Sequence, residues 1–94
     1  MNDSSGHVFH PGHEELHGVT VVLEGASGRT YVGRYHERSD RGVIMHDVAI
    51  YEPGATQYGR EEWLERQRKF GVQAIHRHLV VPGEEVKGLT RFAS

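Results

Sequence analysis

The chain has 94 residues, with 11 basic and 13 acidic side chains, so its formal net charge is −2 when histidine is neutral. This length suits one domain rather than two, and the charge balance excludes a protein that binds nucleic acid through a strongly basic surface alone. The absence of cysteine excludes disulfides and thiolate chemistry, and no apolar run approaches the ~20 residues of a membrane helix. Because no signal peptide is visible after Met1, we expect a cytoplasmic protein with no membrane partner.

The N-terminal part of the chain is rich in histidine. Residues 1–12 have no hydrophobic period, which predicts a flexible tail ahead of a single domain over residues 13–94. Residues 11–17 could form one helical turn, because proline suits its first position. His10, His13 and His17 would then share a face and could hold zinc or nickel. A solvated tail explains the same residues, and we predict no metal site and no cofactor.

Three strands are expected next, at about residues 19–24, 29–37 and 43–51. Two polar turns, at residues 25–28 and 38–42, separate them. Gly33 lies in the middle of the second strand, among β-branched and aromatic residues. A glycine there indicates a strong bend or the close approach of another backbone. A long bent strand in a short meander is typical of a small barrel.

The hydrophobic period changes after Pro53 and Gly54. Residues 60–70 carry glutamates in the first turn and basic residues in the last, which suits a helix dipole. Trp63, Leu64 and Phe70 form a narrow apolar stripe, so we predict a short helix, within an insertion at about residues 52–71, that packs its tryptophan on the sheet. Residues 72–81 and 86–92 return to strand character. The expected fold is therefore mainly β, with five strands and a helix between the third and the fourth.

The first three strands resemble the first motif of the Sm and Sm-like proteins, a superfamily that includes the bacterial RNA chaperone Hfq. That motif is an apolar strand, a glycine-containing strand, an acidic turn and another apolar strand. Here Gly33, Tyr35 and Asp40 occupy its fixed positions, between the apolar residues 19–23 and 43–48. The resemblance covers residues 19–51 and 75–92.

The second Sm motif is a short strand, an Arg-Gly pair and another short strand. Residues 79–89 fit this pattern, with Pro82 and Gly83 where Arg-Gly would stand. The resemblance implies a strongly bent, five-stranded Sm-like (SH3-like) barrel. It also implies a ring of five to seven copies, in which the fourth and fifth strands pair with neighbouring copies. The nucleic-acid-binding residues that it implies are Arg38, Asp40, Arg41, Gly42, Pro82 and Gly83.

Two positions depart from the family's uridine site. The Sm turn carries an asparagine shortly after its aspartate, whereas here Arg41, Gly42 and Val43 follow Asp40. The motif arginine is replaced by Pro82. Glycine, valine and proline offer no side-chain hydrogen bond to a base. Two functions therefore stay open: a ring-forming module that binds RNA or another nucleic acid, and an oligomeric protein-interaction scaffold that binds none.

No motif indicates an enzyme. The glycine-rich residues 25–29 lack the strand–loop–helix context of a phosphate loop and are read as a hairpin turn. His36, Ser39 and Asp40 are neighbours along one strand and turn, which does not converge on a nucleophile as a catalytic triad does. His76 and His78 share one face of a strand, either as a ligand surface or as half-exposed strand residues. We therefore expect no catalytic residues.

Overall fold

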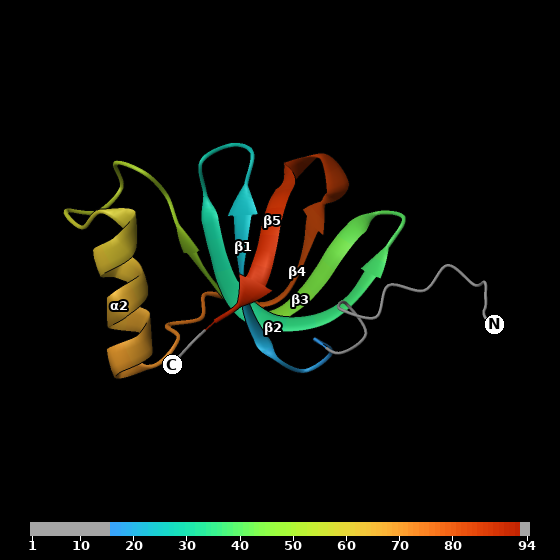
Figure 1. Ribbon diagram of the computed structural model, residues 1–94, viewed down its shortest axis with the longest axis horizontal. Coiled ribbons are helices and arrows are strands. Elements are labelled where there is room, and N and C mark those ends of the chain that lie inside the picture. Colours follow the sequence, from blue (N-terminus) through green and yellow to red (C-terminus); the bar gives the residue numbers. More distant parts are fainter. Residues whose placement is uncertain (1–15, 93–94) are drawn as a thin grey trace.

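A computed structural model describes residues 16–92 (Figure 1). All five strands form one antiparallel sheet, in the order β4-β3-β2-β1-β5. The elements are β1 (Thr20–Gly25), β2 (Thr30–Ser39), β3 (Gly42–Tyr51), α2 (Arg60–Phe70), β4 (His76–Pro82), the 3₁₀ turn η1 (Gly83–Glu85) and β5 (Val86–Arg91). The predicted mainly β fold, with five strands and a helix between the third and fourth, is confirmed. The expected tail over residues 1–12 and most of the expected turn at residues 11–17 lie outside the described residues.

The sheet is strongly curved, but it is not closed. Its two ends are β4 and β5, and no backbone ladder joins them within residues 16–92. The described strands therefore form one curved sheet, and strand pairing within residues 16–92 does not close it into a barrel. Two strand edges stay exposed instead.

Gly33 permits a close approach between β2 and β3. Opposite it, the register shifts by one residue, because Val32 pairs with Ala49 while Arg34 pairs with His46. A side-chain carbon at position 33 would lie 3.0 Å from backbone atoms of His46, Asp47 and Val48. Asp47 has a left-handed backbone (φ 52°), as expected in a β-bulge. The prediction that another backbone comes close to this glycine is confirmed.

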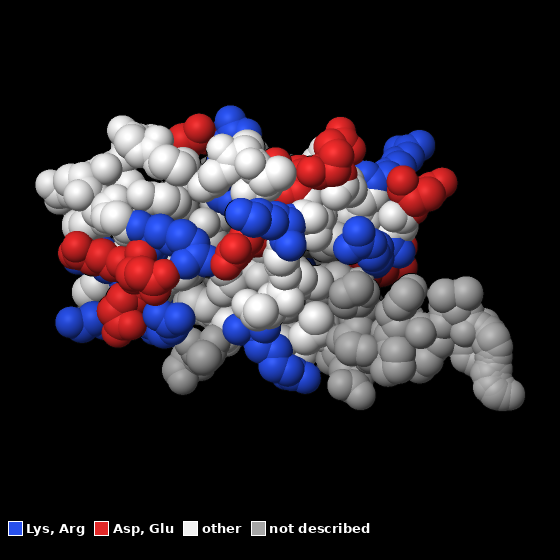
Figure 2. Space-filling model, turned by 45° about the horizontal axis from the view of Figure 1, so that its top comes forward, with Lys and Arg blue, Asp and Glu red and all other residues white. Residues whose placement is uncertain are grey.

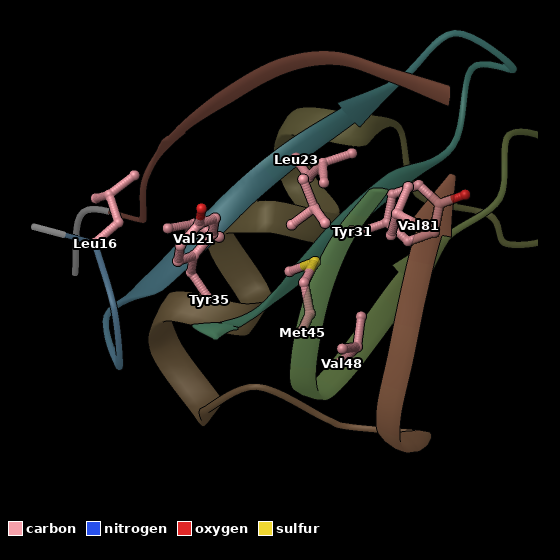
Figure 3. Close-up of a cluster of buried hydrophobic side chains, with 9 residues drawn as sticks. Leu16, Val21, Leu23, Tyr31, Tyr35, Met45, Val48 and Val81 are labelled. Carbon is pink, nitrogen blue, oxygen red and sulfur yellow. The ribbon is translucent and has the colours of Figure 1, made fainter. Parts of the chain in front are cut away.

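The main hydrophobic core lies on the concave side of the sheet, where side chains from β1, β2, β3 and β4 point toward one another (Figure 3). Its buried members are Leu16, Val21, Leu23, Tyr31, Tyr35, Val43, Met45, Val48 and Val81. A smaller cluster of Val22, Val32 and Leu64 lies under α2. Successive residues of a strand point to opposite faces, so β1 contributes to both clusters.

Helix α2 is attached mainly through Leu64, which is only 4% exposed. Trp63 is half-buried and lies 5.5 Å from Tyr51 between ring centroids, so the predicted packing of the tryptophan is confirmed. Phe70 was expected on the same apolar stripe, and that expectation is wrong because it is 59% exposed. Phe70 is the last residue of α2, and its ring lies 5.4 Å from the Arg66 guanidinium and 5.6 Å from the Lys69 ammonium of the same helix. The stripe therefore ends before the last residue of the helix, and the Phe70 ring contacts charged side chains of α2 instead of the sheet.

Candidate nucleic-acid interface

The residues that the Sm resemblance selects come together at one end of the sheet. Ser39 pairs with Gly42 to close the β2–β3 hairpin, and Gly42 also pairs with Pro82 of β4. The turn of the first motif therefore touches the proline–glycine corner of the second, although they are far apart in sequence. The sequence alone could suggest this meeting only through the family resemblance.

Gly42 is the point of closest contact between the turn and the corner. Its φ is 136°, a conformation that favours glycine. A side-chain carbon there would collide with the carbonyl oxygen of Val81 and lie 2.9 Å from the Cα of Pro82. The glycine thus serves chain packing at this position, and it provides no side chain for a ligand.

Ser39 shapes the tip of the hairpin. The backbone N–H of Arg41 donates to the Ser39 Oγ at 3.1 Å, and that hydroxyl lies 3.4 Å from the carbonyl oxygen of Gly42. The side chains of Arg38, Asp40 and Arg41 are exposed, and none of them forms an ion pair within residues 16–92. Two guanidinium groups are therefore presented to solvent from one turn.

The electrostatic character of this end of the sheet is balanced. Arg38 and Arg41 contribute two positive charges, and Asp40 and the exposed Glu84 contribute two negative ones. Figure 2 shows basic and acidic side chains interspersed over the visible face, with no broad basic patch. Guanidinium groups can contact phosphates, but phosphate binding needs several such contacts to be tight. The arrangement can make a few polar contacts to a nucleic acid and does not form a basic groove.

Glu85 holds the corner in place. Its carboxylate accepts hydrogen bonds from the Ser27 hydroxyl at 2.5 Å, the Ser27 N–H at 3.0 Å and the Tyr31 hydroxyl at 2.9 Å. The hydrogen bond from Ser27 is the main reason that the pKa of Glu85 lies below its usual value. Burial, followed by the bond to Glu85, raises the pKa of Tyr31. These hydrogen bonds therefore join the β1–β2 hairpin to η1, the 3₁₀ turn that begins at Gly83.

Sequence reasoning missed a second arrangement, which we call the histidine row: His17, His36, His46 and His78. Successive ring centroids lie 5.1, 4.9 and 5.2 Å apart. The four rings come from the turn before β1 and from β2, β3 and β4. The sequence placed His78 on one face of a strand together with His76. The structure adds that His78 lies opposite His46 on the neighbouring strand. Only the strand register, which sequence spacing does not reveal, could have indicated the row.

Within the described part of the chain, no three histidine, cysteine, aspartate or glutamate side chains converge on a point that one metal ion could occupy. No helix of residues 16–92 is long and apolar enough to cross a membrane. No protein-family model matches the chain, and no curated protein sequence is significantly similar to it.

Proposed function

We propose that the protein is an Sm-like module that assembles into a closed homo-oligomer of five to seven copies. The observation that carries the proposal is the strand order, with β4 and β5 at the two exposed ends of one curved sheet. Exposed strand edges are templates for pairing with another chain. Pairing the β4 edge of one copy with the β5 edge of the next would remove both edges at once.

The two edges are suited to each other. They have similar lengths, seven residues in β4 and six in β5. Because they are different surfaces, their contact is head-to-tail, and such contacts produce a ring when the rotation closes. Ile75, directly before β4, is 67% exposed in the single chain, and a neighbouring copy would cover this apolar side chain.

In such a ring, the turn with Arg38 and Arg41 would recur once per copy, beside the Pro82 corner. We propose this repeated rim as the nucleic-acid-binding surface, with the arginines contacting phosphates. The balanced charge and the absent asparagine and arginine of the Sm uridine site limit its affinity. We expect oligo-uridine to bind near neutral pH with a dissociation constant weaker than about 10 μM, in the range of non-specific binding.

The alternative is an oligomeric scaffold that binds proteins and no RNA. It is favoured by the same observation that weakens the first proposal, namely that Gly42 and Pro82 stand where base-contacting side chains would be. The two proposals share the ring and differ in what the rim binds.

Light scattering coupled to gel filtration tests the ring, and fluorescence anisotropy with short oligo-U, oligo-A and mixed RNAs at pH 7.5 and pH 5.5 tests the rim. Binding should strengthen at pH 5.5, because the protein gains positive charge as the pH falls. The double variant Arg38→Gln/Arg41→Gln should weaken any binding, whereas the matched control Arg66→Gln/Lys69→Gln on α2 should not.

Each result separates the proposals. A monomer of 10.6 kDa at micromolar concentration would refute the assembly. A closed oligomer that binds no RNA at either pH would leave the scaffold as the function. Submicromolar, uridine-selective binding at pH 7.5 would show that the turn replaces the missing side chains.

A further inference from the structure

We propose that the histidine row binds a borderline divalent cation, such as zinc or nickel, at a site centred on His46. The proposal is independent of the ring and of RNA binding. It departs from the sequence-based expectation of no metal site, because the row is assembled by the fold from four separate elements.

The spacing of the rings fits a shared ion. A zinc–nitrogen bond of about 2.0–2.1 Å and a tetrahedral angle place the centroids of two imidazoles on one ion about 5 Å apart. The three successive separations in the row are 5.1, 4.9 and 5.2 Å. In the proposed site, two neighbouring rings of the row turn so that each directs one nitrogen to the same cation.

His46 is the member best placed to hold the ion. It lies between His36 and His78, with centroids 4.9 and 5.2 Å away, so it can share a cation with either. His46 and His78 are also direct partners in the β3–β4 register, which fixes the distance between their backbones. Because the three rings do not converge on one point, the ion takes two imidazoles from the row, and water completes its coordination.

His17, at one end of the row, has the kind of hydrogen bond that often orients a metal-binding histidine. The Nδ1 of His17 lies 2.5 Å from the carbonyl oxygen of His36. A carbonyl oxygen can only accept, so Nδ1 carries the hydrogen of this bond and Nε2 is the ring nitrogen that faces away from it. Metal-binding histidines generally donate their other ring nitrogen to a carbonyl or carboxylate in this way.

One of the positive charges beside the row is paired with a carboxylate. Arg34 is the β2 partner of His46, and its guanidinium forms an ion pair at 2.5 Å with Asp47 of β3. The Arg34 charge is thus matched by a carboxylate, and the same carboxylate also lies in the field of Arg77. Imidazole ligands favour zinc, copper and nickel over calcium or magnesium, which prefer oxygen.

Isothermal titration of the full-length protein with Ni²⁺ or Zn²⁺, in a buffer that does not chelate metals, tests the proposal. We expect saturable binding that weakens at least about tenfold in His46→Ala, since even residues that only orient a metal ligand contribute 10- to 100-fold. The matched control is His76→Ala, on the same strand as His78 but outside the row, and it should bind as the wild type does. The exposed His78 provides a second variant, His78→Ala, whose folding is less at risk.

The triple variant His7→Ala/His10→Ala/His13→Ala separates the row from the histidines of the tail. If it retains binding while His46→Ala loses it, the row is the site. The proposal is overturned if no saturable binding occurs, if the triple variant alone abolishes it, or if His76→Ala and His46→Ala weaken it equally. With Cu²⁺ as the probe, electron paramagnetic resonance should show coupling to imidazole nitrogens that is lost in His46→Ala.

Discussion

Replacing Gly33 with alanine tests how rigidly the two bulged strands approach each other. Alanine in a strand is normally favoured over glycine by about 0.5–1 kcal/mol. Here the added carbon would lie 3.0 Å from the carbonyl oxygens of His46 and Asp47 and from the Cα of Val48. These are backbone atoms held in the β3 ladder, so they cannot rotate away as a side chain would. Overpacking of this kind costs about 1–3 kcal/mol.

The clash should therefore exceed the intrinsic gain, and Gly33→Ala should destabilise the fold by about 1–2 kcal/mol. For a domain of this size that lowers the melting temperature by about 5–15 °C. Circular dichroism during heating measures it, at equal protein concentrations because assembly also shifts the transition. Gly33→Val should be worse, because its added methyl groups need still more room.

Gly88 provides a matched control in β5. An alanine carbon there would meet only atoms of Glu24, the nearest at 3.9 Å, an ordinary contact distance. Gly88→Ala should therefore leave stability unchanged or slightly increase it. If Gly33→Ala is as stable as Gly88→Ala, the bulge yields to a methyl group and the explanation given for Gly33 is wrong.

Two further substitutions test the supports of the fold. Leu64→Ala removes the buried side chain that attaches α2, so it should lower the free energy of unfolding by about 2–4 kcal/mol and shift the Trp63 fluorescence to the red. The control Glu65→Ala, at an exposed neighbouring residue, should lower it by less than about 0.5 kcal/mol. Equal effects of the two substitutions would contradict the attachment through Leu64. Glu85→Gln should lower the melting temperature at pH 7, and its difference from the wild type should shrink as the pH falls below about 4.5. Because the pKa of Glu85 is lower in the folded than in the unfolded protein, its carboxylate stabilises the fold above the unfolded pKa, and this stabilisation is lost as the pH falls through the folded pKa. A difference in melting temperature between Glu85→Gln and the wild type that stays constant from pH 7 to pH 3 would contradict this.

Local sequence patterns predicted most of the secondary structure. The helix was expected at residues 60–70 and spans Arg60–Phe70, and each of the first three strands begins within one residue of its predicted start. The largest error is at residues 72–75, which were assigned to the fourth strand. Val72 packs against the cluster under α2 instead, and Gln73 donates its N–H to Gln67. Contacts with the helix keep this segment out of the sheet, and such contacts leave no period in the sequence.

The candidate sites differ in how far the sequence could predict them. The turn around Asp40 and the Pro82 corner were identified because each is a contiguous motif, and the structure adds that Gly42 joins them. The histidine row has no contiguous signal. Its members lie on four elements, and which histidines become neighbours depends on strand register.

That register depends on two bulges that alternation alone does not predict. From the hairpin pair Ser39–Gly42, an uninterrupted ladder would place Met45 opposite His36, and His46 opposite Tyr35. Polar rings would then face the hydrophobic core, which is costly. The shift between Tyr35 and Glu37 instead pairs Tyr35 with Met45 in the core and leaves the histidines on the other face. The need to bury Tyr35 against Met45 thus explains why the imidazoles gather outside, and the row is a consequence of packing the core.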